Sequence, residues 1–275
     1  MKTLLSTPII TKVALISATA VLGGFTLIPT TASALSLDGS AKVTTPEVKV
    51  DTNTNVNVTT NSTSTNSATE KAKLQNIITK GDQEIARRLA SLSKLTSKIN
   101  AATKLTGADK ATLTAEVNAT ISGLNTLKAK LDAETTVAAA RADVQSIYTE
   151  YRVYALVAPK VGLIKVADDQ QVAEQKLQAL IQKFQTRLNA AKSKGKNVDA
   201  LETVLSDMTQ KVNASASISS TIQAKVIGLQ PTDYNNDHAV LNGTSAQLKT
   251  AHTDNVAAYQ DAKQIVAGLK GLQSK

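Results

Sequence analysis

The chain has 275 residues, a formal net charge of +9 and no cysteine, which excludes disulfide bonds, thiolate metal sites and cysteine nucleophiles. Hydrophobic residues make up 42% of the chain and aromatic residues only 3%, which favours thin helix-on-helix seams over one thick core. The positive charge favours anionic partners.

Residues 1–34 have the pattern of a secretory signal peptide. Lys2 and Lys12 precede or border an apolar run over residues 13–28, and residues 32–34 read Ala-Ser-Ala. We therefore expect cleavage near Ala34, and a secreted or cell-surface protein. The alternative is an uncleaved anchor, which is disfavoured because the apolar run is shorter than the roughly 20 residues of a spanning helix. No second run of that length follows, so we expect no transmembrane helix in the mature chain.

Residues 35–68 are rich in Thr, Asn and Ser and predict a disordered linker, because they bury too little apolar surface to offset their ordering entropy. Ser67 and Glu70 form a capping-box pattern that predicts the start of a first helix. A seven-residue repeat typical of a coiled coil follows, at Ile78, Ile85, Leu92 and Ile99.

A second and a third helix are predicted before residue 158. Thr106 and Asp109 predict an N-cap after a short turn, so the first two helices should form an antiparallel hairpin. The second helix carries a regular apolar seam at Leu113, Val117, Leu124, Leu127 and Leu131, broken by Thr120. The third helix should open at Thr135 or Thr136. We expect it to fail between Tyr154 and Pro159, because the residue before a proline is disfavoured in the α region.

Pro159 suits the first turn of a fourth helix, predicted over residues 160–194. Asn197 should cap a fifth helix that Pro231 stops, residues 233–237 should form a loop, and a sixth helix should run from about His238 to Leu269. Residues 92–102 resemble residues 181–191 in pattern. The predicted fold class is all-α, with about six long amphipathic helices in antiparallel hairpins or bundles. Two related three-helix units, residues 69–158 and 159–275, would explain the repeat.

No catalytic motif is present in the sequence. His238 and His252 show no metal-ligand spacing, and no serine or threonine has a plausible histidine base. The carboxylate pairs Asp132/Glu134 and Asp168/Asp169 are interpreted as helix-terminus residues that favour the helix dipole. We therefore expect a protein that is not an enzyme, with no catalytic residue, no metal site and no cofactor.

The candidate binding residues are Tyr148, Tyr151, Arg152 and Tyr154, three residues apart along a helix except for the arginine. We favour a structural interpretation, in which the tyrosines fill space in an Ala/Leu-rich core. The alternative is an exposed patch that binds a sugar or a protein, since Tyr and Arg are enriched in binding hot spots. Burial of all three tyrosines would favour a protein that binds or scaffolds at a cell surface, and an exposed patch facing a concave surface would favour a small-ligand or wall-polymer-binding protein.

Residues 160–196 hold eight basic and three acidic residues, a net charge of +5. Such a segment can be the solvated face of a bundle, or it can bind an anionic cell-wall polymer or membrane surface. Nucleic acid is not expected as a partner, because the sequence has no pattern of stacking aromatics.

The segments 112–117, 122–124, 139–144 and above all 151–157 (Tyr-Arg-Val-Tyr-Ala-Leu-Val) resemble uncharacterised secreted all-helical proteins of candidate-phylum bacteria. The resemblance spans roughly residues 83–269 and implies export and a helical body, without an activity. The sequence thus predicts a secreted, non-enzymatic protein that binds or scaffolds at the bacterial cell surface, its partner being an anionic surface or another protein. The alternative is an extracellular ligand- or wall-polymer-binding protein with a site near the tyrosines.

Overall fold

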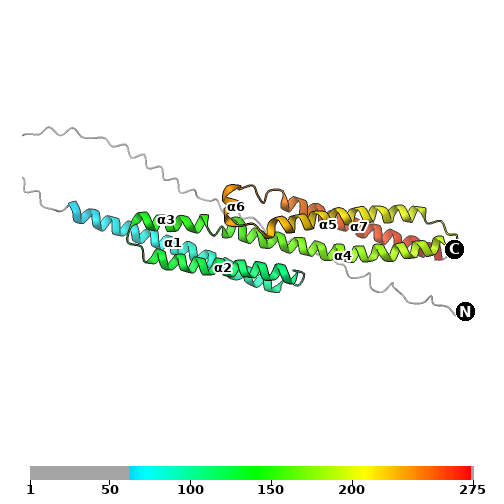
Figure 1. Cartoon of the computed structure of the whole chain (residues 1–275), viewed down its shortest axis with the longest axis horizontal. Coiled ribbons are helices and arrows are strands. Elements are labelled where there is room, and N and C mark those ends of the chain that lie inside the picture. The colour runs from blue at the N-terminus through cyan, green and yellow to red at the C-terminus, as the bar shows by residue number, and fades with distance from the viewer. Residues whose placement is uncertain (1–61, 274–275) are drawn as a thin grey trace, which may run out of the picture. The chain divides into compact units, whose positions relative to one another are not determined.

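The computed structural model describes residues 62–273, and every regular element in this range is a helix (Figure 1). The predicted all-α fold class is confirmed. The signal-like residues 1–34 and residues 35–61 of the predicted linker lie outside the described residues. Helix α1 (Ser62–Ala101) begins earlier than predicted, so residues 62–68 are helical and Ser67 lies inside the helix instead of capping it.

Helices α2 (Gly107–Asp132) and α3 (Val137–Thr149) pack against α1 and against each other. The predicted cap at Thr106 is confirmed, and of the two predicted starts of the third helix, Thr136 is the N-cap. The Thr106 hydroxyl accepts from the Asp109 amide at 3.1 Å, and the Thr136 hydroxyl accepts from the Ala139 amide at 3.2 Å. These caps satisfy amides that have no partner within their own helix.

The helix break lies earlier than predicted. Arg152 adopts a left-handed conformation with φ 41° and ψ 36°, and a π-helix, η2 (Val153–Val157), runs directly into α4 (Ala158–Lys192). The expectation of a break between Tyr154 and Pro159 is therefore wrong, and Ala158 is α-helical. The restriction on the residue before a proline is a preference, and Ala158 takes φ −68° and ψ −45° while its amide donates to the carbonyl of Val153, so the helix continues into Pro159.

Helices α4, α5 (Asp199–Ile227) and α7 (Thr244–Gln273) pack against one another. The predicted loop contains a short helix, α6 (Pro231–Asn236), which is capped by Gln230 and Asp233. Helix α7 begins later than predicted, because residues 238–243 form turns. The N-cap residue of α5 is Val198 and not Asn197 as predicted; Asn197 lies one position earlier, and its side-chain oxygen accepts from the amide of Asp199 at 3.1 Å.

The apolar core forms two clusters. The first joins residues of α1, α2 and α3 to η2, the start of α4 and the end of α5, including Ile85, Leu131 and Ile164. The second lies between the remaining parts of α4, α5 and α7, including Phe184 and Met208. The first cluster is continuous from α1 to α5, so the helices on either side of Pro159 share a core.

Gly81 of α1 is a point of close helix packing. A Cβ added there would lie 2.4 Å from Leu131 Cδ2 and 2.9 Å from Val144 Cγ2. We expect Gly81→Ala to lower the free energy of unfolding by about 1–2 kcal/mol, because overpacking outweighs the helix propensity that alanine gains. Urea denaturation measures this. Gly162→Ala in α4 is the control, since nothing lies within 4 Å of that Cβ and the variant should be more stable than the wild type.

Candidate functional site

The tyrosine segment places two aromatic rings on the surface around a buried arginine. Tyr148 and Tyr154 are 43% and 49% exposed. The guanidinium of Arg88, from α1, lies 4.7 Å from the centre of the Tyr148 ring and 5.1 Å from that of Tyr154. Both distances are within the range of a cation–π interaction. The Tyr154 hydroxyl also lies 3.1 Å from the hydroxyl of Ser91.

Arg88 forms an ion pair with Glu84, which lies one helical turn earlier in α1. Burial lowers the pKa of Arg88, and the phenols of Tyr148 and Tyr154 partly offset that effect. Arg88 Nε is buried without a hydrogen-bond partner among the described residues. The guanidinium of Arg88 thus contacts both tyrosine rings, and each ring remains partly exposed to solvent. We call Arg88, Tyr148 and Tyr154 the tyrosine patch.

The other two predicted binding residues have structural partners. Tyr151 is half-buried and lies against Gly123 of α2, where an added Cβ would be 2.6 Å from its ring. Burial and the nearby Glu150 raise the pKa of its phenol. Arg152 donates from Nε to Asn235 Oδ1 at 2.6 Å, and Asn235 donates to the carbonyl of Thr149 at 2.8 Å. Of the four predicted residues, Tyr148 and Tyr154 are thus exposed. Tyr151 and Arg152 instead contact α2 and α6.

Arg88 was missed by the sequence analysis as a member of the site. A signal for it exists, since it stands three residues after Ile85 and four before Leu92. That is a seam position, where the heptad pattern calls for an apolar residue. A charged residue at such a position needs a specific partner.

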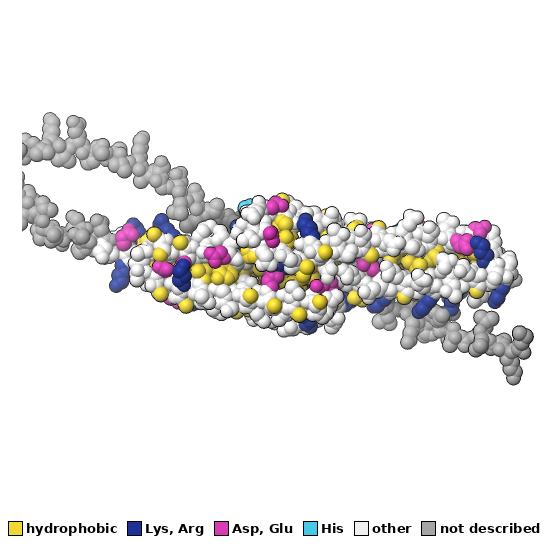
Figure 2. Space-filling model, viewed as in Figure 1, with side chains coloured by type: hydrophobic (Ala, Val, Ile, Leu, Met, Phe, Trp, Pro, Cys, Tyr) yellow, Lys and Arg dark blue, Asp and Glu magenta, His cyan; other side chains and the backbone are white. Residues whose placement is uncertain are grey.

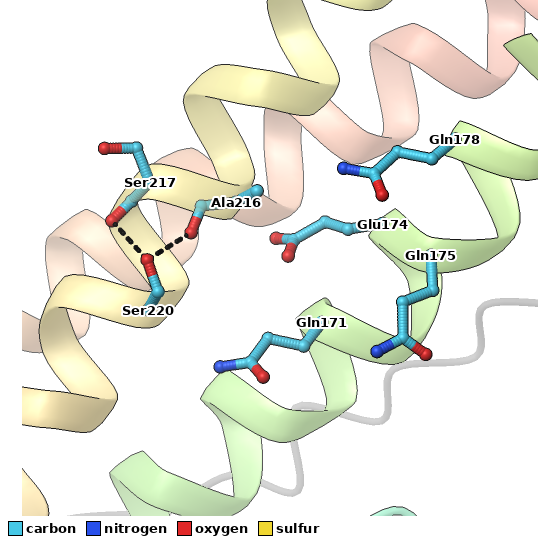
Figure 3. A pocket seen from close by; sticks show the side chains of 7 residues that line it. All are labelled: Gln171, Glu174, Gln175, Gln178, Ala216, Ser217 and Ser220. Atoms are coloured by element: carbon cyan, nitrogen blue, oxygen red, sulfur yellow. Dashed lines mark hydrogen bonds between the residues drawn. The ribbon is translucent and has the colours of Figure 1, made fainter.

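A polar groove lies between α4 and α5 (Figure 3). Its volume is about 380 Å³, and its lining residues are Gln171, Glu174, Gln175, Gln178, Ala216, Ser217 and Ser220. Glu174 is 3% exposed, and its Oε1 accepts from the hydroxyls of Ser215 at 2.6 Å and Ser219 at 2.9 Å. The groove contains no residue of the tyrosine patch.

Glu174 belongs to a polar layer that separates the two apolar clusters. Beside it, Asn255 donates to Gln170 Oε1 at 2.8 Å, and Gln170 Nε2 lies 3.4 Å from His252 Nδ1. Hydrogen bonds offset the cost of burying these groups. Because each bond requires one particular alignment of α4, α5 and α7, the layer fixes the register of these helices.

Two buried carboxyl groups meet where α2, α4 and α5 converge. Asp168 of α4 is 1% exposed and Asp109 of α2 is 6% exposed. Asp168 Oδ2 accepts from the backbone amide of Thr106 at 2.8 Å, and Asp109 Oδ2 accepts from Gln223 at 2.6 Å. The pKa of Asp168 is raised to about 6, chiefly by burial and also by Asp109 and Asp169, while the hydrogen bond from the Thr106 amide acts in the opposite direction. Asp168 was interpreted as lying at an end of its own helix, which is wrong: it lies within α4 and contacts the start of α2.

Within residues 62–273, no group of three or more His, Cys, Asp or Glu side chains could hold a metal ion. No helix in the same range is long and apolar enough to cross a membrane. Compared with protein-family models, curated proteins and solved structures, the chain matched none.

Proposed function

We propose that the chain is a secreted, non-enzymatic helical protein that binds a partner at the bacterial cell surface, and that the tyrosine patch contacts this partner. The observation that carries the proposal is the exposure of Tyr148 and Tyr154 on either side of a buried Arg88. Exposed aromatic side chains with little rotational freedom are typical of binding hot spots. The signal-like residues 1–34 support export.

The surroundings of the patch favour a partner that lies across it. The rings stand on α3 and η2, outside the groove between α4 and α5. A small ligand is normally enclosed in a concave pocket, whereas a polymer or a protein can contact a convex aromatic surface. We therefore favour a macromolecular partner over a small extracellular ligand.

Replacing both rings with alanine tests this proposal. The full chain should sediment with isolated cell envelopes of the producing bacterium, and Tyr148→Ala/Tyr154→Ala should bind at least about tenfold more weakly, because hot-spot aromatics contribute about 2 kcal/mol or more each. Tyr148→Phe/Tyr154→Phe keeps the rings and is the matched control, so its binding should stay close to that of the wild type. Equal binding by the alanine variant and the wild type would contradict the proposal.

A further inference from the structure

The outer face of α4 carries a row of basic side chains without acidic partners. Lys176, Lys183 and Arg187 are separated by seven and four residues, and Lys194 follows seven residues later in the turn after the helix. At about 100° per residue, these spacings place the three helical members within roughly 40° of one another around the axis. All four are exposed. We call these four residues the basic stripe.

The stripe differs in its lack of ion pairs from Lys160, Lys165 and Lys192 of the same segment. Lys165 pairs with Asp169 at 2.7 Å and Lys192 with Glu202 at 3.0 Å. Lys160, which the sequence analysis counted in the same basic segment, is fully buried against Glu116. Among the residues that the structure describes, no carboxylate lies within 4.0 Å of a stripe nitrogen. The charge of the stripe is therefore free for an external anion.

The shape of the stripe indicates a linear partner. From Lys176 to Arg187 it extends for about 17 Å along α4, at a rise of about 1.5 Å per residue, and Lys194 follows in the turn after the helix. Figure 2 shows Lys and Arg side chains along the edge of the molecule where Figure 1 places α4. A chain of anionic groups laid along the helix can contact every member of such a row.

The neighbouring side chains argue against insertion into a lipid bilayer. Ala179, Gln182, Thr186 and Ala190 lie beside the basic residues and are exposed. The exposed large hydrophobic residues of the described range are Tyr148, Tyr154 and Val256, none of them on α4. Helices that lie in a membrane interface need an apolar face, which this side of α4 does not have.

We propose that the basic stripe binds a linear polyanion that carries phosphate groups. Lys supplies a compact charge and Arg a fork of donors, and both bind phosphate through charge-assisted hydrogen bonds. The inference rests on the proposed cell-surface function and deepens it, because it names the chemistry of a surface polymer and a second contact area, separate from the tyrosine patch.

The test uses the full chain and fluorescent inorganic polyphosphate, at about 50 and 200 mM salt. The stripe variant is Lys176→Gln/Lys183→Gln/Arg187→Gln/Lys194→Gln. Its control removes the same charge from exposed positions on α1, α3, α5 and α7: Lys94→Gln/Arg141→Gln/Lys225→Gln/Lys249→Gln. We expect the stripe variant to bind at least about tenfold more weakly and to lose most of the salt dependence, because released counterions follow the neutralised phosphates. The control should lose much less, and circular dichroism should show both variants folded.

Equal losses in the two variants would overturn the proposal, since net charge alone would then explain binding. It would also be overturned if anionic phosphatidylglycerol vesicles, but not polyphosphate, bound in a stripe-dependent way. Lys183→Glu/Arg187→Glu is a smaller substitution that should abolish polyphosphate binding if the stripe is the contact. The tyrosine alanine variant should still bind polyphosphate, so failure of the tyrosine patch in the envelope assay and failure of the stripe are separate results.

Discussion

Lys160→Met should lower the free energy of unfolding by about 3 kcal/mol, the low end for a broken buried pair, because it leaves the partly buried Glu116 carboxylate without its partner. The side chain of Lys160 is fully buried, and its Nζ donates to both carboxylate oxygens of Glu116 at 2.8 and 2.9 Å. It also donates to the backbone carbonyl of Leu229. One ammonium group thus ties the first turn of α4 to α2 and to the segment after α5.

The double variant Lys160→Met/Glu116→Leu distinguishes the loss of the ion pair from the cost of leaving one charged partner unpaired. It should recover much of the stability, because a buried ion pair can often be replaced by apolar residues of similar size at little cost. The Leu229 carbonyl stays without its donor and should keep a cost of about 1–3 kcal/mol. Lys192→Met is the control: it breaks an exposed pair with Glu202 and should change the free energy of unfolding little. Chemical denaturation measures all four proteins, and a cost for Lys160→Met as small as that of the control would contradict the structural role.

Asp168→Asn should raise the free energy of unfolding at pH 7 by about 2–3 kcal/mol. The pKa of Asp168 rises from 3.8 to about 6 in the folded protein, chiefly because burial disfavours its charged form. Between about pH 4 and pH 6 the folded state therefore binds more protons than the unfolded state, so stability falls as the pH rises through this window. Above about pH 6, the ionised Asp168 carboxylate lowers the stability by about 1.4 kcal/mol for each pH unit between its folded and unfolded pKa values.

The pH dependence distinguishes this cause from a simple packing effect. The difference in stability between Asp168→Asn and the wild type should grow from about pH 4 to about pH 6 and then stay constant. Asp109→Asn removes a neighbouring charge that raises the pKa of Asp168. The stability of this variant should therefore fall less steeply with pH in this window than that of the wild type. Unfolding by urea at several pH values measures both variants. Parallel stability curves for Asp168→Asn and the wild type would contradict the prediction.

Local chemistry made much of the helical body predictable from the sequence. Thr106 and Thr136 cap helices as expected, since a cap depends on residues three or four positions away along the chain. The apolar seams predict the buried face of each long helix, because the periodicity of apolar residues is a property of a single helix. The break was misplaced because the rule for the residue before a proline is a preference, and Ala158 takes α-helical φ and ψ, while the break lies at the left-handed Arg152, which no local pattern indicated.

The partners of the polar residues depended on the tertiary structure. Lys160 and Lys176 are both lysines of one basic segment and cannot be distinguished from the sequence. In the structure, Lys160 is buried against Glu116, 44 positions away, and Lys176 faces solvent. Asp168 meets Thr106 across 62 positions, and Tyr154 meets Ser91 across 63. By itself the sequence determined the long helices, the cap at Thr106 and the buried faces, because these follow from neighbours along the chain. Only the tertiary structure decided which charges are buried, which tyrosines are exposed and which basic residues form the stripe, because those depend on which helix packs against which face.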